Sequence, residues 1–344
     1  MSVFVPWHHG GELISAALAA ALVCAGLIVA LMPLLQRYAL ARPNARSSHV
    51  TPTPQGGGVA VVAATMLVAT AIVLLSPEYF AGVTWPLTLL FLSAIALAAV
   101  GCIDDIWVID VLPRLIFQFA AVIAVVVALP GDLDVVPVLP AWVESLAAVF
   151  IGVWFVNLVN FMDGIDWITV VETAAITLGI ILIGCIVPLS AISVVIAIAL
   201  LGATLGFAPF NRPVARLFLG DVGSLPIGLL LFWLLLHLAA AGHLAAAILL
   251  PLYYLADATV TLLRRAVRGE RVTQAHRSHY YQQATARGFS VTEVLLRIGV
   301  VNALLVVLAL ISVWMHTRAA DIATIVIGCG TVAGLLAMLS RGKR

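Results

Sequence analysis

Residues 85–105 read WPLTLLFLSAIALAAVGCIDD, an apolar run of membrane-spanning length that ends in two adjacent aspartates. A helix needs about 20 predominantly apolar residues to cross a hydrocarbon layer of about 30 Å. The first part of this run, 85–101, contains no charged side chain, which is typical of a transmembrane helix. The stretch therefore predicts a membrane span with a polar site at one end.

The composition extends this prediction to the whole chain. Of the 344 residues, 63% are hydrophobic and only 10% are charged, and the mean hydropathy is +1.17. Soluble domains carry roughly 25% charged residues. Further apolar runs lie near 12–36, 57–75, 114–129, 141–158, 168–187, 190–207, 222–240, 243–263, 295–314 and 320–340. We expect an all-α polytopic membrane bundle of about 11 transmembrane helices, forming a single domain over 1–344.

The distribution of positive charge predicts the orientation. With the amino terminus outside, every Lys and Arg except Arg318 falls in an inner loop or at an inner helix end. Positive residues are retained on the cytoplasmic side of membrane proteins. We therefore expect the carboxyl terminus and the polar loops near Asp104 to be cytoplasmic.

The second inner loop begins with Asp104 and Asp105. Adjacent carboxylates at a membrane helix end repel each other and lose hydration, so they favour a nearby cation or a shared proton. Magnesium prefers oxygen ligands and is usually held by one or two carboxylates plus substrate phosphates. A solvated pair of loop aspartates is the alternative interpretation.

Two further inner loops are rich in glycine. Gly56-Gly57-Gly58 opens into a span and is able to turn backbone N–H groups toward an anion, although a tight entry into the helix is the favoured interpretation. Asp221 lies in Gly220-Asp221-Val222-Gly223-Ser224, where the glycines allow a carboxylate and backbone amides to approach one ligand. A purely structural reason for that loop is the alternative.

The third inner loop carries Asn157, Asn160, Asp163 and Asp166, each three residues from the next. In a helix this spacing stacks the four side chains on one face. A polar stripe inside a membrane bundle is a functional hypothesis by default, and Asn and Asp suit hydrogen bonds to a nucleotide as well as a metal. The alternative, a helix cap followed by an Asp-Gly turn, accounts only for Asp163 and the following Gly164.

The last long inner loop contains a basic run, Arg264 to Arg271, which is typical of anchoring near anionic lipid. It is followed by His276, Arg277 and His279, which are close enough in sequence to face one phosphate or diphosphate. A zinc site needs more ligands than this cluster offers. For Asp257, earlier in the preceding span, we expect an ion pair at the inner boundary, two helical turns from Arg264.

These polar clusters all fall on the predicted cytoplasmic side, which favours an enzyme that acts on soluble metabolites and membrane lipid. A transporter of ions or of lipid-linked substrates is the alternative, but it predicts polar residues near the middle of several spans. An inactive scaffold is a third class, and it predicts that an aspartate of the set has been lost.

The residues in this order resemble one family. Asp104-Asp105, Asn157-x-x-Asn160-x-x-Asp163-Gly-x-Asp166, Phe218-x-Gly-Asp221-x-Gly-Ser224 and a late histidine cluster are similar to the polyprenyl-phosphate N-acetylhexosamine-1-phosphate transferases. The resemblance extends from about Arg42 to Gln282. The amino-acid sequences around His49 and over His276–Gln282 most resemble those of the O-antigen-initiating branch. That branch is related to the phospho-N-acetylmuramoyl-pentapeptide transferases.

The resemblance implies a reaction and its partners. Such enzymes transfer an N-acetylhexosamine 1-phosphate from a UDP-sugar to undecaprenyl phosphate and release UMP, with Mg²⁺, or Mn²⁺ in its place. It further implies a multi-pass protein of the bacterial inner membrane that starts O-antigen or other cell-surface polysaccharide synthesis. A homodimer is compatible with this interpretation, and no nucleic acid partner is expected.

The resemblance also implies roles for individual residues. Asp221 and Asp105 are metal ligands, and Asp104, Asp105, His276 and His279 are catalytic, with a base toward the lipid phosphate among the aspartates. Nucleotide or substrate contacts are implied for His49, Asn157, Asn160, Asp163, Asp166, Asn211, Phe218 and Arg277, with Phe218 as a stacking ring. Trp167 in place of a small residue, and two histidines in place of three in a row, argue against a muramoyl-pentapeptide donor.

Overall fold

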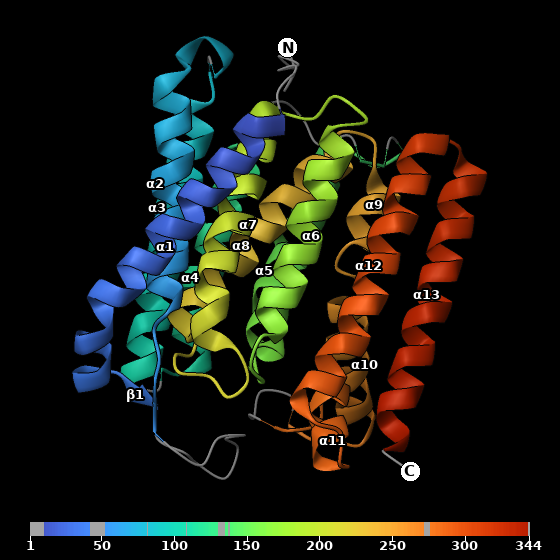
Figure 1. Cartoon of the computed structure of the whole chain (residues 1–344). Coiled ribbons are helices and arrows are strands. Elements are labelled where there is room, and N and C mark those ends of the chain that lie inside the picture. Colours follow the sequence, from blue (N-terminus) through green and yellow to red (C-terminus); the bar gives the residue numbers. More distant parts are fainter. Residues whose placement is uncertain are drawn as a thin grey trace.

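The computed structural model describes residues 10–41, 52–80, 82–107, 109–129, 135–136, 138–271 and 276–342. Within these ranges the chain is almost entirely helical, with a small antiparallel ribbon (Figure 1). The elements are α1 (Gly10–Tyr38), β1 (Leu40–Ala41), β2 (Thr53–Pro54), α2 (Gly58–Leu75), a 3-10 turn (Pro77–Tyr79), α3 (Thr84–Ile106), α4 (Val111–Val127), α5 (Ala141–Met162), α6 (Ile168–Gly184), α7 (Ala191–Asn211), α8 (Asp221–Ala240), α9 (Leu244–Leu249), α10 (Leu252–Val267), α11 (Tyr280–Ala286), α12 (Val291–Met315) and α13 (Arg318–Arg341).

The long helices run side by side as one bundle (Figure 1). Eight of the described helices are long and apolar enough to cross a membrane, and α4 and α6 are shorter apolar helices. The most apolar parts of α7 and α8 are 83% and 89% buried, against 17% for α1. The all-α polytopic membrane prediction is confirmed, with α7 and α8 at the centre of the bundle and α1 at its edge.

The predicted span 243–263 differs from the others because it is divided. α9 ends at Leu249, and α10 begins at Leu252 after Pro251. Proline has no N–H to donate and its ring clashes with the preceding turn, so a helix rarely continues through it. The span is therefore two short helices, and the second one carries Asp257 and the basic run.

The chain brings its polar loops to one end of the bundle. Because successive helices alternate in direction, α3, α5, α7 and α10 end where α8 begins, at the lower end in Figure 1. Arg37, Arg264 and Arg341 lie in the last turns of their helices at this end, whereas Arg318 begins α13 at the other. The predicted gathering of positive charge at one end is confirmed within the described residues.

The glycine run before α2 packs against the loop that precedes α8. The amide of Gly57 donates to the carbonyl of Phe218 (2.9 Å) and the amide of Gly58 donates to that of Leu219 (2.9 Å). A Cβ on Gly58 would lie 2.1 Å from the Cα of Gly223. Of the two interpretations, the tight entry into the helix therefore fits Gly57 and Gly58, whose amides are bonded within the protein where α2 closely approaches α8.

Candidate active site

Asp104 and Asp105 are adjacent in sequence but bind different partners. Asp105 binds the first residues of α8. Its two carboxylate oxygens accept the backbone N–H groups of Asp221 (3.0 Å) and Val222 (3.2 Å). These are donors that a helix leaves unsatisfied in its first turn. A Cβ on Gly101 would lie 2.3 Å from the backbone of Asp221, so α3 and α8 are in close contact. Asp105 thus fixes the position of Asp221.

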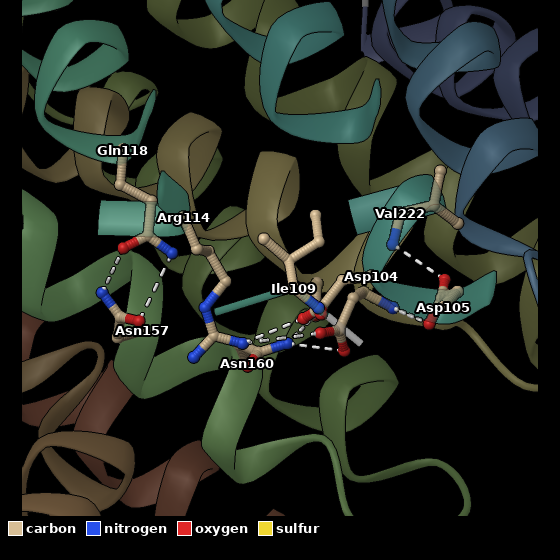
Figure 2. Close-up of polar contacts among 10 residues, drawn as sticks. Asp104, Asp105, Ile109, Arg114, Gln118, Asn157, Asn160 and Val222 are labelled. Carbon is tan, nitrogen blue, oxygen red and sulfur yellow. Dashed lines mark hydrogen bonds and ion pairs between the residues drawn. The ribbon is translucent and has the colours of Figure 1, made fainter. Parts of the chain in front are cut away.

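Asp104 faces a guanidinium group instead. One oxygen accepts the amide of Ile109 (2.7 Å), and the other accepts Nη1 of Arg114 (3.1 Å), which comes from α4. The same Nη1 lies 3.9 Å from a carboxylate oxygen of Asp221. Arg114 is therefore placed between carboxylates of α3 and α8, and Figure 2 shows it beside Asp104.

Asn160 completes the contacts of Asp221. Its side-chain amide donates to an oxygen of Asp221 (2.8 Å) and to the hydroxyl of Ser224 (2.9 Å). Asp221 keeps 32% of its side chain exposed, compared with 11% for Asp104. The carboxylate of Asp221 is thus held on one side by α5 and remains accessible to a ligand.

The donor set at this end suits a hard cation. Asp104, Asp105 and Asp221 offer oxygen atoms and two more formal negative charges than Arg114 neutralises. Among the described residues, however, no three His, Cys, Asp or Glu side chains are arranged to hold a metal by themselves. An ion that keeps waters and takes further ligands from substrate phosphates, as Mg²⁺ does, fits such a site.

Asn157 lies deeper in the bundle than the aspartates. Its side chain is buried and forms a reciprocal amide pair with Gln118 of α4, with distances of 2.6 and 3.3 Å. Because α5 ends at Met162, the four-residue stripe is not continuous. Only Asn157 and Asn160 are helical, and they contact different helices, so the expected single polar face is wrong.

Asp163 follows the last residue of α5 and turns toward α6. Its carboxylate accepts the hydroxyl of Thr169 (2.6 Å), which also lies 3.3 Å from the hydroxyl of Tyr254. Burial raises the pKa of Asp163 to about 7, the Thr169 hydroxyl lowers it, and the charge of Asp105 raises it. The carboxyl group is therefore partly protonated near neutral pH.

Asp166 and Asn211 join the α5–α6 turn to the loop before α8. An oxygen of Asp166 accepts the amide of Ala215 (3.0 Å), and that of Asn211 accepts the amide of Trp167 (2.8 Å). Trp167 adopts a left-handed backbone with φ of 64°. Both predicted residues are buried, so their described contacts position the loops around the site, and nucleotide contact stays a prediction for them.

Phe218 is held by its backbone. It pairs with Gln55 in a parallel bridge, and its amide donates to the carbonyl of Pro54 (2.8 Å). The ring is half-buried, which leaves one part accessible for the predicted stacking on a base.

The histidine cluster lies against α10. His279 is buried, and its Nδ1 is 3.2 Å from an oxygen of Asp257. The ring of His276 stacks on it with 4.9 Å between centroids. Burial, with contributions from His279 and Arg265, lowers the pKa of His276 to about 4, so this ring is neutral at pH 7. Arg277 between them is exposed.

The expected ion pair between Asp257 and Arg264 is not formed. Arg264 donates to the hydroxyl of Tyr280 (2.8 Å), whereas Asp257 accepts donors from the histidine segment. The reason is the start of α11, whose free amides face α10 and provide donors that a buried carboxylate can accept.

The histidine segment also contacts the end of α5. The hydroxyl of Tyr281 donates to the carbonyl of Phe161 (3.2 Å). A Cβ on Gly164 would lie 2.2 Å from that hydroxyl, so only glycine allows this approach. The Asp163 loop and the histidines are thereby packed together.

The structure therefore gathers most of the predicted residues into two adjoining groups, around Asp221 and around His279. His49 lies outside the described residues. The prediction missed Arg114 and Ser224 as partners and Asp257 as the support of His279. A role for Asp257 could have been suspected from the sequence, because a carboxylate inside an apolar span needs a buried partner. The identity of that partner could not, because His279 is 22 residues away.

Comparison with known proteins places the sequence beside transferases that act on polyprenyl phosphates. Residues 87–239 match the sequence model of glycosyl transferase family 4. In an alignment of 347 positions, the chain is 27% identical to decaprenyl-phosphate N-acetylglucosaminephosphotransferase of Mycobacterium tuberculosis, with 88% of this chain and 83% of the relative covered.

Two other relatives carry related names. The probable undecaprenyl-phosphate N-acetylglucosaminyl 1-phosphate transferase of Bacillus subtilis is 26% identical, with 76% of this chain and 75% of the relative covered. The phospho-N-acetylmuramoyl-pentapeptide-transferase of Aquifex aeolicus is 30% identical, with 51% and 56% covered. The matched part includes α3 and α8, which carry Asp104, Asp105 and Asp221, and α5, which carries Asn160. Over the helices that carry its site, the chain is therefore similar to the polyprenyl-phosphate N-acetylhexosamine-1-phosphate transferases and to glycosyl transferase family 4.

Proposed function

We propose that this protein transfers an N-acetylhexosamine 1-phosphate from a UDP-sugar to undecaprenyl or a similar polyprenyl phosphate. An oxygen of the lipid phosphate attacks the β-phosphorus of the donor. The bond from that phosphorus to the oxygen shared with the α-phosphate breaks, and UMP leaves. The product is a lipid-linked diphospho-sugar, the first unit of a cell-surface polysaccharide. O-antigen is the polymer that the His49 and histidine-cluster segments favour.

One observation carries the proposal. Carboxylates from α3 and α8 meet around Arg114 at one end of a membrane bundle, with Asn160 holding Asp221. Phosphoryl transfer depends mainly on positioning and on neutralising the charge that develops on phosphate oxygens. A guanidinium beside carboxylates supplies both a phosphate donor and places for a cation.

The chain's own residues then have distinct tasks. Asp221 and Asp105 would hold Mg²⁺, which supplies charge neutralisation on the phosphates when bound. Arg114 donates to a phosphate oxygen and keeps Asp104 beside the attacking lipid phosphate. Asp163, Asp166 and Asn211 shape the nucleotide side, and His276 and His279 face the diphosphate or the sugar.

An apolar cavity supports the lipid acceptor. It has a volume of about 380 Å³ and lies between α5, α8 and the divided α9–α10 segment, with Ala148, Phe155, Phe232 and Leu255 among its lining residues. At about 1.5 Å per helical residue, Phe155 is about 8 Å along α5 from Asn160. An isoprenoid chain in this cavity would thus leave its phosphate near the aspartates.

The test is release of UMP by purified protein. Polyprenyl phosphate and a panel of UDP-N-acetylhexosamines are supplied, first with EDTA and then with excess Mg²⁺. We expect metal-dependent UMP release with at least one donor, and a loss of at least 100-fold in Asp221→Asn, the order of magnitude for a lost charge-stabilising group. Asp321→Asn is the matched control, because Asp321 contacts Ser312 at the opposite end.

Activity with EDTA equal to that with Mg²⁺ contradicts the metal role. Absence of UMP release with every donor, from protein that remains folded, contradicts the reaction itself. A transporter of lipid-linked substrates would also give no UMP, and the similarity to transferases does not favour it.

A further inference from the structure

Asp257 is a fully buried carboxylate that the proposed reaction leaves without a task. Its side chain is 0% exposed, in the middle of α10. Four donors reach it, namely the hydroxyls of Tyr253 and Thr261 and the amides of Tyr280 and Tyr281, and Nδ1 of His279 lies at a similar distance, all within 3.0–3.3 Å. A buried acid with this many partners is held in one orientation.

These contacts determine which ring nitrogen of His279 carries a proton. A carboxylate accepts only, and its two oxygens offer about four lone-pair sites. The amides of Tyr280 and Tyr281 donate without exception, so each oxygen of Asp257 acts as an acceptor, including the one nearest Nδ1 of His279. Nδ1 of His279 must therefore be the protonated nitrogen, and Nε2 is the atom left for a ligand.

The orientation of the ring is fixed as well. His279 is stacked between His276, at 4.9 Å between centroids, and Tyr281, at 5.7 Å. Tyr281 is in turn bonded to the end of α5 beside the Asp163 loop. The imidazole therefore has a defined place relative to the proposed nucleotide residues.

We propose that Asp257 is a positioning residue for the transfer: it holds the Nδ1 proton of His279 and so presents Nε2 to the donor diphosphate or sugar. The inference rests on the proposed function, in which His279 contacts the donor. Asp257 itself touches no substrate, because both of its oxygens already accept hydrogen bonds from within the protein. Sequence spacing alone gives no reason to connect the two residues.

A merely structural role is the competing explanation, since Asp257 also accepts the first amides of α11. The two explanations differ in a double-mutant cycle. If Asp257 acts through His279, its substitution matters only while His279 is present. If it only holds α11 in place, the loss is the same in both backgrounds.

The experiment measures kcat/KM for UMP release in wild type, Asp257→Asn, His279→Gln and the double variant. We expect Asp257→Asn to lose about 10- to 100-fold, as is typical when the group that orients a working histidine is removed, and under 3-fold in the His279→Gln background. Thr261→Val is the matched control, because it removes another donor to the same oxygen as His279. We expect it to stay within 3-fold of wild type.

A spectroscopic measurement separates this inference from the proposed function. Protein with ¹⁵N-labelled histidine rings, in which the His279 signals are identified by their loss in His279→Gln, reports which nitrogen is protonated. We expect protonated Nδ1 in wild type. A bare Nδ1 with protonated Nε2 overturns the inference, as does an equal loss from Asp257→Asn in both backgrounds. The wild-type spectrum decides the matter even if Asp257→Asn does not fold or no donor yields UMP.

Discussion

At the scale of single residues, two side chains that are adjacent in sequence bind different partners. Asp104 and Asp105 are equivalent in a sequence pattern, yet one faces Arg114 and the other accepts the first amides of α8. Adjacent positions on a helix point about 100° apart, so they meet different partners. The sequence was sufficient to predict carboxylate chemistry at this helix end, but the partners come from elements 10 and 116 residues away.

Asp163 provides a prediction about pH. Burial raises its pKa from 3.8 to about 7, so the folded protein binds a proton between these values that the unfolded chain releases. Its contribution to stability is present below pH 4 and is lost as the pH rises through 7. In Asp163→Asn this loss is absent. We expect the melting temperature of the variant, relative to wild type, to increase from pH 5 to pH 8.

Thermal unfolding in detergent with EDTA measures this difference. Thr169→Val is the companion variant, because it removes the hydroxyl that lowers the pKa of Asp163. In Thr169→Val we expect the pH range over which the contribution of Asp163 to stability is lost to move upward. A melting temperature difference between Asp163→Asn and wild type that is constant or shrinks with rising pH is evidence against the shift.

At the scale of elements, the helices were more predictable than their ends. Long apolar runs fix the helices because backbone groups in hydrocarbon must be bonded internally. Where α5 stops depends on contacts distant in sequence: Asp163 bonds Thr169, and Tyr281 bonds the carbonyl of Phe161. The three-residue spacing predicted a helix that continues to Asp166, because sequence spacing contains no information about these distant partners.

Gly164 tests the contact between the α5 end and the histidine segment. We expect Gly164→Ala to lower UMP release at least 10-fold, since its Cβ would lie 2.2 Å from the Tyr281 hydroxyl, and overpacking of this kind costs about 1–3 kcal/mol. Removing that hydroxyl in the double variant with Tyr281→Phe should restore part of the activity.

The matched control is Gly330→Ala, because a Cβ there meets nothing within 4 Å. It should have wild-type activity. If Gly164→Ala is as active as this control, the packing of the two segments does not matter for the reaction.

At the scale of the whole molecule, one end holds the candidate site and, among the described arginines, all except Arg318. Charge counting predicted this arrangement because every membrane crossing reverses the side, so a miscounted span would have mixed the two ends. The divided α9–α10 segment does not disturb the count, since both parts together cross once (Figure 1). The distribution of charge does not predict which helices are neighbours in the bundle, because that order depends on side-chain packing.

Orientation in the cell is tested by labelling with a membrane-impermeant maleimide. Cys102, Cys185 and Cys329 are exposed and Cys24 is buried, so all four are first replaced by alanine. In intact spheroplasts we expect Arg318→Cys to react and Arg268→Cys to be protected, with the reverse in inverted vesicles. The opposite pattern would place the site outside the cytoplasm, away from UDP-sugars.

The amide pair between Gln118 and Asn157 has a consequence for motion. A slide of α4 along α5 by one residue, or a rotation by one position, would separate two buried amides, at a cost of about 1–3 kcal/mol for each group left unbonded. The two helices therefore behave as one rigid body during turnover. Any lateral opening that admits the acceptor lipid has to form on the other side of α5, where the α9–α10 break already interrupts the wall of the bundle.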